Sequence, residues 1–360
     1  MKVIIFAGGI GTRLWPLSRK NTPKQFEKII GDKSTIQQAV DRLLPEFSFS
    51  DIYIATGKRY QDIVREQLPQ IPSKNFVFEP QMRDVGPAIG LMASILAKEF
   101  PNEPMAILWS DHMVKQIEIF KKALFIAEKA ISQKQSDFVF IAQKPRFANQ
   151  NMGWIEVGEE LEQTDNVTVF RFKKLFYRPK LQEAVSFFEN KNFVWNLGYF
   201  VTTPIFLQNM YKQFAPSLFS SLQEIASSYG GSDFEQKLQD IYPKLEKVSF
   251  DDLVLVKMEA NNTLVISADL GWSDVGAWES LKEALSKTQQ ENATKGKVLI
   301  QDSRDSLVFN YNDQLLVGID LEEMLIINTA DVILVCPKKS VPKIKKLVES
   351  LSGTPHEHLT

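Results

Sequence analysis

The sequence predicts an α/β fold in which an open, mostly parallel, doubly wound sheet is followed by a small all-β appendage. In residues 1–142, short runs of β-branched and aromatic residues alternate with longer segments whose apolar residues recur at helical spacing. This alternation is typical of strands joined by helical crossovers. After residue 289, short strand-like runs follow one another without intervening helices, which indicates a separate β-rich module.

The expected elements of the first part follow in order along the chain. Strands are expected at residues 3–6, 52–55, 76–78, 105–108 and 138–142. Amphipathic helices are expected at residues 35–44, 60–68, 88–98 and 119–131. In open α/β sheets, ligands bind beyond the carboxyl ends of the strands. Functional residues are therefore expected just after Phe6, Phe78 and Leu108.

The remaining elements suggest two domains, residues 1–289 and 290–360. The middle of the chain continues the first domain, with strands expected at residues 167–172 and 199–202 and helices at 181–190 and 204–214. The second domain has expected strands at residues 298–300, 307–309, 315–319, 325–328 and 332–336, and a closing helix at 341–351. Its last residues, including His356 and His358, are expected to form a frayed tail.

The composition is that of a folded globular protein. Of 360 residues, 44% are hydrophobic and 24% charged, and 42 Lys and Arg nearly balance 44 Asp and Glu. The net charge of -2 creates no bulk field for nucleic acid or anionic membranes, so neither is expected as a partner. No secretory signal pattern precedes the first strand, and the single cysteine, Cys336, is expected to be buried. These features favour a cytoplasmic protein.

A glycine-rich loop follows the first expected strand and is the strongest candidate for a binding site. After Phe6 the chain reads Ala7, Gly8, Gly9, Ile10, Gly11, Thr12 and Arg13. Glycine permits positive φ angles and close backbone approach, so the N–H groups of such a loop can converge on phosphate oxygens. A tight strand-to-helix turn would explain the glycines equally well. Arg13 and Lys24 favour the phosphate site, since they add one forked and one point-like cation.

Two common phosphate-binding motifs do not fit this loop. A P-loop ends in Gly-Lys-Ser/Thr, whereas Thr12, Arg13 and Leu14 follow the last glycine here. The dinucleotide fingerprint requires a small residue at the position of Leu14. The loop therefore predicts neither a P-loop ATPase nor a dehydrogenase.

The loop and the residues after it are part of a longer signature. Residues 6–19 (FAGGIGTRLWPLSR) and 23–26 (PKQF) resemble the signature of the mannose-1-phosphate guanylyltransferases, the GDP-mannose pyrophosphorylases among the sugar-phosphate nucleotidyltransferases. Trp15 points to this branch and not to the branches that use glucose 1-phosphate. Further similar motifs follow in the same order: Glu79-Pro80 with Arg83, Pro87-Ala88-Ile89, Ser110-Asp111-His112, Trp195-Asn196 with Gly198 and Phe200, and residues 271–276 (GWSDVG).

The resemblance implies a fold, a reaction and its partners. The expected fold is a nucleotide-binding, Rossmann-like mixed sheet of the nucleotidyltransferase and glycosyltransferase-A-like type, and residues 296–335 are similar to the family's left-handed β-helical segment. The expected reaction transfers GMP from GTP to mannose 1-phosphate, which gives GDP-mannose and pyrophosphate, with Mg²⁺ as cofactor. The expected partners are GTP and a sugar 1-phosphate, and a homodimer stays open.

The chemistry of this reaction defines the side chains it needs. The sugar phosphate attacks the α-phosphorus in line and is already largely ionised at pH 7, so neither a protein nucleophile nor a general base is required. The protein has to position the phosphates and neutralise their charge. Arg13 and Lys24 are therefore the expected catalytic residues, Arg13 at the β and γ phosphates and Lys24 near the α-phosphoryl group.

The resemblance also assigns a metal site to Asp111 and Asp274. Magnesium favours few carboxylates together with phosphates and waters, which fits two aspartates. The alternative for Ser110-Asp111-His112 is the N-cap of a helix. Because both aspartates follow the loop in the order of the family's motifs, the metal site is favoured over the helix cap.

The other expected ligand contacts fall into two groups. Nucleotide contacts are assigned to Ala7, Gly8, Gly9, Gly11, Thr12, Glu79, Pro87, Ala88 and Asp111, and sugar-phosphate contacts to Gly153, Arg178 and Asn196. The carboxylate of Glu79 can accept hydrogen bonds from N1–H and N2–H of guanine, and adenine offers no such pair of donors. The alternative for Glu79 is an ordinary salt bridge with Arg83.

Most departures from the family pattern fall on the sugar side. Asp84, Gly86, Trp109, Tyr177, Leu197, Asp252 and Val256 stand where the family has other residues. Trp109 replaces a small residue or proline, Tyr177 an acid and Leu197 a serine. Sugar hydroxyls would then lack partners, so one explanation is a different sugar 1-phosphate and another is a non-catalytic nucleotide-sugar sensor. A glycosyltransferase would need an Asp-X-Asp metal motif, which Ser110-Asp111-His112 lacks.

Overall fold

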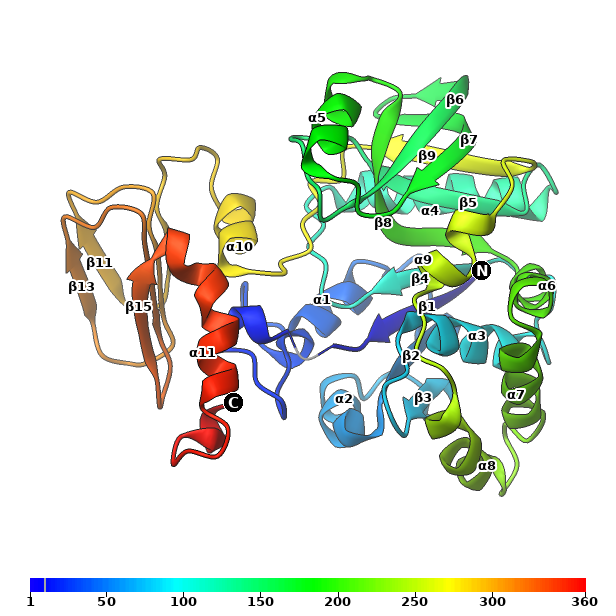
Figure 1. Ribbon diagram of the computed structural model, residues 1–360, viewed down its shortest axis with the longest axis horizontal. Helices are drawn as coiled ribbons and strands as arrows, with labels where there is room; N and C mark the ends of the chain where they lie inside the picture. The colour runs from blue at the N-terminus through cyan, green and yellow to red at the C-terminus, as the bar shows by residue number, and fades with distance from the viewer. Residues whose placement is uncertain (10) are drawn as a thin grey trace. The chain divides into compact units, whose positions relative to one another are not determined.

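The computed structural model describes residues 1–9 and 11–360, with the backbone but not the side chain of Thr12 (Figure 1). The chain forms two compact units, each built from separate segments. The first unit comprises Met1–Gly8, Ala39–Ser110 and Val114–Gly271. The second comprises Gly9–Gln38, Asp111–Met113 and Trp272–Thr360. These units group residues by contact, and the domain boundary at residue 289 stays a prediction.

The first unit is built on a nine-stranded mixed sheet in the order β3-β2-β1-β4-β8-β5-β9-β7-β6. Its strands are β1 (Lys2–Ala7), β2 (Ile52–Gly57), β3 (Phe76–Glu79), β4 (Met105–Trp109), β5 (Phe138–Gln143), β6 (Gly153–Thr164), β7 (Val167–Phe176), β8 (Phe193–Thr202) and β9 (Thr263–Ala268). Strands β1 to β4 run parallel, as the strand and helix alternation predicts. The mixed α/β class is confirmed.

Beyond β4 the sheet is mixed, as the family resemblance implies, and it departs from the parallel order that the alternation of strands and helices predicts. Strand β8 lies between β4 and β5 and is antiparallel to both, so β5 is not a neighbour of β4. Strand β9 is parallel to β5, whereas β7 and β6 are antiparallel to their neighbours. Backbone hydrogen bonding across distant segments decides this order, and local apolar patterns carry no signal for it.

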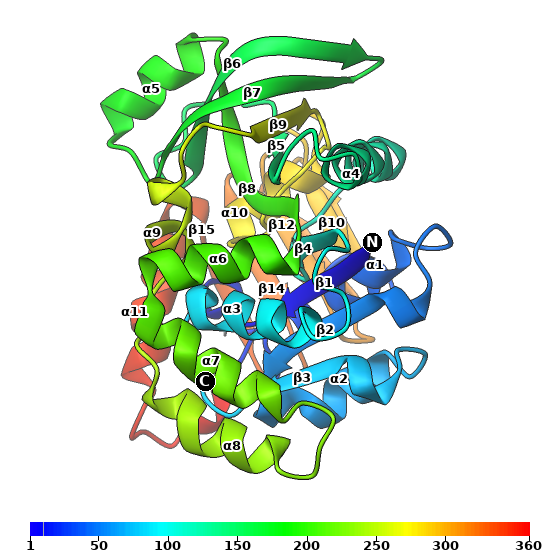
Figure 2. The ribbon, with the colours of Figure 1, turned by 90° about the vertical axis from the view of Figure 1, so that its right-hand side faces the viewer.

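Helices cover the sheet of the first unit. They are α2 (Gln61–Gln67), α3 (Val85–Leu96), α4 (Ile117–Ser132), α5 (Leu181–Glu189), α6 (Pro204–Phe214), α7 (Pro216–Ser227), α8 (Phe234–Ile241) and α9 (Phe250–Leu253). Figure 2 shows α3, α6 and α7 side by side. Their close approach requires Gly90 of α3, because a Cβ there would lie 2.6 Å from Leu222 Cδ1 and 2.7 Å from Tyr211 Cε1.

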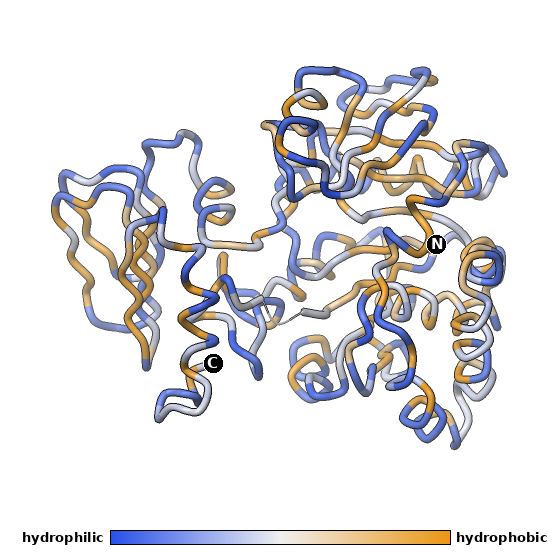
Figure 3. The backbone as a smooth tube through the Cα atoms, in the orientation of Figure 1, coloured by the Kyte–Doolittle hydropathy of each residue, from blue (hydrophilic) through white to orange (hydrophobic). Residues whose placement is uncertain are grey.

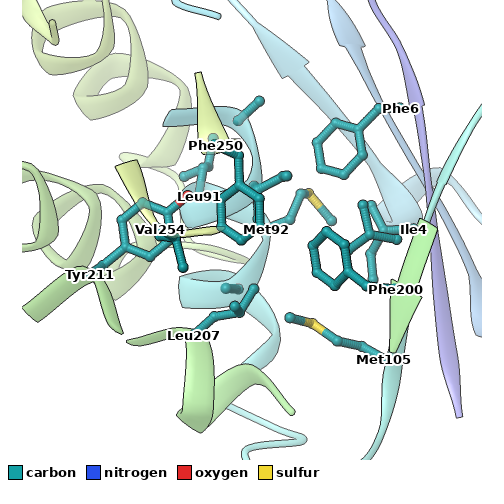
Figure 4. Close-up of a cluster of buried hydrophobic side chains, with 14 of the residues drawn as sticks. Ile4, Phe6, Leu91, Met92, Met105, Phe200, Leu207, Tyr211, Phe250 and Val254 are labelled. Atoms are coloured by element: carbon teal, nitrogen blue, oxygen red, sulfur yellow. The ribbon is translucent and has the colours of Figure 1, made fainter. Parts of the chain in front are cut away.

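The core of the first unit lies between the sheet and these helices. Ile4 and Phe6 of β1 alternate with residues that face the other side, as a strand with two buried faces requires. Their side chains meet Met92 of α3 and Phe200 of β8 (Figure 4). Hydrophobic stretches run along strands such as β1, whereas the region of β6 and β7 includes hydrophilic stretches (Figure 3). This packing holds the carboxyl ends of β1 and β4 in fixed register.

The second unit contains stacked short strands. Strands β10 (Ala293–Lys295), β12 (Leu307–Asn310), β14 (Met324–Asn328) and β15 (Ile333–Pro337) form one sheet, and β11 (Val298–Gln301) and β13 (Leu316–Ile319) form another. Leu307 pairs in parallel with Leu325, and Val298 with Leu316. Two strand pairs with the same offset in sequence are typical of stacked β-helical coils. The small sheets thus fit a β-helix.

Side chains join the rest of the second unit to these coils. Its helices are α10 (Trp278–Leu285) and α11 (Ile344–Ser350), and α1 (Thr35–Asp41) begins in this unit and ends in the first. Trp278 packs in one buried cluster with Trp15 and Phe309. The buried carboxylate of Asp305 contacts the ammonium groups of Lys282 and Lys338, each at 2.5 Å.

Two expectations for the C-terminal residues are wrong. The tail is not frayed, because the indole N–H of Trp15 donates to the carbonyl of Leu359 at 2.7 Å and the backbone N–H of Lys20 to that of Thr360 at 3.4 Å. Cys336 is only partly buried, since its strand has one exposed face. Within the described residues, no helix has the length and apolar composition needed to cross a membrane.

Candidate functional site

The glycine loop connects β1 of the first unit to the second unit. Gly9 and Gly11 have φ angles of 92° and 64°, in the left-handed region that favours glycine. A Cβ on Gly11 would lie 2.9 Å from Cγ of Lys24, so this glycine also makes room for the lysine stem. The carbonyl of Gly9 accepts a hydrogen bond from Gln25 Nε2 at 3.2 Å. The side chain of Thr12, a predicted nucleotide contact, lies outside the described part of the chain.

The start of the loop offers only backbone groups to a ligand. The side chain of Ala7 is buried, and its carbonyl accepts a hydrogen bond from Thr56 Oγ1 at 2.7 Å. Gly8 is exposed, with open space where a side chain would project. Contacts from these two positions would therefore come from peptide N–H groups, as the sequence predicts for a phosphate cradle.

Lys24 is the centre of a charged cluster in the second unit. Its buried side chain places Nζ 2.7 Å from Oδ2 of Asp111. The same ammonium donates to the backbone carbonyls of Asp274 and Val275, at 3.2 and 3.4 Å. Burial would raise the pKa of Asp111, but the nearby Lys24 and His112 hold this pKa below its usual range. Residues far apart in sequence thus meet at one cation.

The turn around Asp274 also brings Arg13 close. Oδ1 of Asp274 accepts a hydrogen bond from the backbone N–H of Gly276 at 3.3 Å. A Cβ on Gly276 would lie 2.7 Å from Asp274 Oδ2 and 3.2 Å from a guanidinium nitrogen of Arg13. Glycine is therefore required where these two charged groups approach the backbone. The side chain of Arg13 is exposed, so it can reach a ligand.

The two aspartates suit a hard divalent cation. Asp111 places a carboxylate beside the Lys24 ammonium, which also binds the backbone carbonyl of Asp274, and carboxylates are oxygen donors of the kind that Mg²⁺ takes. Among the described residues, no group of three or more His, Cys, Asp or Glu could hold a metal alone. A cation held here would need further ligands, as Mg²⁺ takes from phosphates and water.

The helix-cap alternative for Asp111 is wrong. The next helix, α4, begins six residues later at Ile117, with Gln116 as its N-cap residue. Met113 instead forms an isolated antiparallel bridge with Ser273, through backbone hydrogen bonds of 2.9 and 3.0 Å. This bridge ties the segment of Asp111 to the segment of Asp274.

Glu79 lies at the end of β3 in the first unit. Its Oε2 accepts a hydrogen bond from the hydroxyl of Tyr242 at 2.6 Å, and Arg83 donates to Gln81 at 2.9 Å, so the alternative of a Glu79–Arg83 salt bridge is not the observed pairing. Burial raises the pKa of Glu79 to about 7, although the Tyr242 hydrogen bond opposes this. Near pH 7 about half of the Glu79 side chains are therefore neutral, so the capacity of Glu79 to accept hydrogen bonds from ligand N–H groups changes with pH.

Pro87 and Ala88 form the buried first turn of α3. Asp84 caps this helix, since its carboxylate accepts a hydrogen bond from the N–H of Val85 at 2.7 Å. The N–H of Gly86 donates to the carbonyl of Val248 at 2.9 Å. The side chains of Pro87 and Ala88 are buried, and their contact with a nucleotide stays a prediction.

Two of the predicted sugar-phosphate residues are neighbours across strands of the first unit. Gly153 of β6 pairs with Asn196 of β8, and a Cβ on Gly153 would lie 3.2 Å from Cβ of Asn196. Arg178 lies in a different setting. It is exposed, has a φ of 49°, and stacks over the ring of Tyr177 at 5.0 Å.

Acidic residues surround Tyr177 and Arg178. Burial raises the pKa of Asp251 to about 6, and Asp252 and Asp84 add to the shift while Arg178 opposes it. Burial, and then Asp251, also raise the pKa of Tyr177. Asp84, another departure from the family pattern, adds to the rise in the pKa of Tyr177.

Sequence reasoning missed several residues that shape these sites. Tyr242 holds Glu79, and Ser18 Oγ accepts a hydrogen bond from the backbone N–H of Lys24 at 3.0 Å. The indole of Trp109 reaches the carbonyl of Gly198 at 3.2 Å. Ser18 lies within the signature of residues 6–19 and Trp109 stands out just before Ser110, but neither signal identifies the contact that the residue makes. Tyr242 lies 163 residues from Glu79, and nothing local marks it.

Comparisons with known proteins show the family to which the chain is related. The profile of the family described as "Nucleotidyl transferase" matches residues 2–291. The chain is 31% identical over 357 residues to mannose-1-phosphate guanylyltransferase 2 of Escherichia coli O157:H7, covering 97% of this chain and 73% of the relative. It is 30% identical over 354 residues to mannose-1-phosphate guanylyltransferase RfbM of Salmonella typhimurium strain LT2, covering 97% and 72%.

A solved structure has a similar fold over almost the whole chain. It is described as a mannose-1-phosphate geranyltransferase from Thermus thermophilus. The TM-score is 0.85 at 25% identity, and the alignment covers 98% of this chain and 99% of the other.

Proposed function

The chain belongs to the nucleotidyl transferase family, and we propose that it is a GTP-dependent mannose-1-phosphate guanylyltransferase. The reaction joins mannose 1-phosphate to GMP from GTP and releases pyrophosphate. The observation that carries the proposal is the charged cluster of the second unit, where Lys24 meets Asp111 and Asp274 beside the glycine loop. A buried lysine between two acidic segments is suited to a triphosphate that brings its own negative charge.

The phosphate chemistry follows from these groups. A phosphate oxygen of the sugar attacks the α-phosphorus in line, and the bond from the α-phosphorus to the bridging oxygen of pyrophosphate breaks. Lys24 stabilises the charge that develops at the α-phosphoryl group, and Arg13 with the N–H groups of Gly9 and Gly11 holds the β and γ phosphates. Because the sugar phosphate is the nucleophile, the protein contributes no covalent step.

A divalent cation belongs to this chemistry. Members of this family use one, and we propose Mg²⁺ with Asp111 and Asp274 as its protein ligands. When bound, the ion would supply positive charge to phosphate oxygens. Lys24, which contacts Asp111 in this structure, would then share that carboxylate with the ion.

The first unit supplies the recognition residues in this proposal. One oxygen of Glu79 is bonded to Tyr242, and the carboxylate would accept N–H groups of guanine. Asn196, opposite Gly153, and the exposed Arg178 would contact the sugar phosphate. The stacked coils of the second unit support a β-helix, which we propose to be left-handed. Cytoplasmic location and a homodimer stay predictions.

A second candidate is a guanylyltransferase for another sugar 1-phosphate. Asp84 and Tyr177 favour it, because a carboxylate and a phenol stand where the family pattern has an amide and an acid. A non-catalytic sensor would not need both Asp111 and Asp274.

One experiment separates these functions. The protein is incubated with GTP, Mg²⁺ and each of a panel of sugar 1-phosphates, and pyrophosphate release is measured. Release that is fastest with mannose 1-phosphate supports the first proposal, and release only with another sugar supports the second. GTP binding by calorimetry without release from any sugar would identify a sensor. The control variant is Asp274→Asn, which should lose turnover with every sugar.

A further inference from the structure

Trp109 occupies the carboxyl end of β4, where the family pattern has a small residue or proline. Its ring packs on Phe6, its partner in the register of β1 and β4, with ring centroids 5.3 Å apart. Its indole N–H donates to the carbonyl of Gly198 on β8 at 3.2 Å. The side chain thus spans from the centre of the sheet to a residue close to the predicted sugar-phosphate contacts.

Gly198 lies in an irregular part of β8. The register with β5 passes directly from Ile141 opposite Tyr199 to Ala142 opposite Asn196. Leu197 and Gly198 are therefore the extra residues of a bulge, which is a common device for aiming a side chain near a functional site. Gly198 has a φ of 71°, and a Cβ on it would lie 2.6 Å from Nε1 of Trp109. Glycine is required there by both the backbone and the indole.

The bulge determines how Asn196 presents its side chain. The backbone N–H of Gly198 donates to Oδ1 of Asn196 at 3.0 Å, so the amide oxygen is already bonded. The group of the side chain left for a ligand is the NH₂ donor, which suits an oxygen of a phosphate or hydroxyl. Asn196 is buried and faces Gly153, which leaves its amide little freedom to turn.

We propose that Trp109 is a positioning residue that acts through Asn196, an inference that rests on the proposed function. The indole N–H holds the Gly198 carbonyl, the Gly198 N–H holds Oδ1 of Asn196, and the Asn196 NH₂ is thereby directed at the sugar phosphate. A small residue or proline has no side-chain donor for the carbonyl. Trp109 and the buried Leu197, two departures from the family pattern, then belong to one packed arrangement next to the sugar-phosphate contacts.

A double-mutant cycle tests this inference. Trp109→Phe keeps an aromatic ring against Phe6 and removes the N–H donor. We expect the KM for the sugar 1-phosphate to rise about threefold to tenfold, as the loss of one hydrogen bond allows, with the KM for GTP unchanged. Asn196→Ala should raise the same KM at least as much. In the Asn196→Ala background, Trp109→Phe should add nothing, because the group through which Trp109 acts is gone.

Other outcomes contradict the proposal. Additive effects of the two substitutions, or equal rises in the KM values for sugar phosphate and GTP, would show a general structural role for Trp109. An unchanged sugar-phosphate KM in Trp109→Phe would show no role. Thermal unfolding of each variant shows whether lost stability accounts for the change.

A second measurement keeps the inference separate from the proposed function. If the wild-type protein releases no pyrophosphate with mannose 1-phosphate, the proposed function fails. Hydrogen exchange of the Gly198 amide, which donates to Asn196, still reports the arrangement. We expect this amide to exchange faster in Trp109→Phe than in the wild type, while amides of β2 keep their rates. Equal exchange at Gly198 in both proteins would overturn the inference.

Discussion

The phosphate-binding residues of the second unit and the sugar-side residues of the first unit differ in how firmly the fold holds them. Lys24 is buried, its ammonium contacts Asp111 and two backbone carbonyls, and Gly11 leaves room for its stem. Arg178 is exposed, and the structure gives it a stacking contact with Tyr177. Departures from the family pattern fall mostly on the sugar side, at exposed and buried positions alike. Tightly packed charged groups tolerate few replacements, because each one supports several others.

The largest effect should come from Lys24. Lys24→Ala removes a buried cation from the developing charge at the α-phosphorus, so we expect kcat for pyrophosphate release to fall about 100-fold to 1,000-fold. Lys28→Ala, which removes an exposed lysine from the same segment, should change kcat little. Similar losses in both variants would mean that the firm contacts of Lys24 serve stability and not catalysis.

The next effect tests whether buried charges also hold the second unit together. Asp305→Asn leaves Lys282 and Lys338 without their counter-charge, and we expect the free energy of unfolding to fall by about 3 kcal/mol. Burial alone would raise the pKa of Asp305, but the two lysines hold this pKa below its usual range. The stabilisation by ionised Asp305 is therefore fully present above the pKa that Asp305 has in the unfolded chain. It is lost as the pH falls through the pKa that Asp305 has in the folded protein. Denaturant unfolding at several pH values should show that the free energy of unfolding falls less with acid in Asp305→Asn than in the wild type. An equal fall in both proteins would contradict this prediction.

A smaller effect should appear with pH at Glu79. Its pKa of about 7 makes the carboxyl partly neutral below pH 7, and the neutral form is a poorer acceptor for guanine. Between pH 8 and pH 6 we expect the dissociation constant for GTP to rise up to about tenfold, following the ionised fraction. Calorimetry at several pH values measures this. Glu79→Gln should remove the pH dependence and reduce the preference for GTP over ATP, and an unchanged preference would exclude Glu79 as the reader of the base.

The smallest effect should come from Arg178. Because its guanidinium is exposed, Arg178→Ala should raise the KM for the sugar 1-phosphate only about threefold, with kcat nearly unchanged. Steady-state kinetics with saturating GTP measures this. Arg171→Ala, which removes another exposed arginine of the first unit, is the matched control. A fall in kcat as large as that expected for Lys24→Ala would contradict the contrast between the phosphate-binding residues and the sugar-side residues.

The sequence predicted local features well and long-range pairings poorly. The strands before Ala7 and Glu79 and the helix after Asp84 follow from hydrophobic periodicity and turn residues, which act over a few positions. The insertion of β8 between β4 and β5 depends on backbone pairing between distant segments, and no local pattern encodes it.

The candidate site divides in the same way. Arg13, Lys24, Asp111 and Asp274 were found from a contiguous signature and ordered motifs, and the structure brings them into one cluster. The hydroxyl of Tyr242 on Glu79 could not be predicted, because a tyrosine in a short turn has no distinguishing neighbours. The Leu197 bulge also needs a partner strand to define it.

The segmented construction of the second unit has a consequence for protein synthesis. Lys24 contacts a carbonyl 250 residues later, and Trp15 one 344 residues later. During translation from the N-terminus, the glycine loop therefore emerges long before Asp274 and the tail that complete its surroundings. A growing chain cannot assemble the phosphate cluster until the segment of Asp274 has left the ribosome. Nucleotide binding by the nascent protein should accordingly begin only after that segment has emerged.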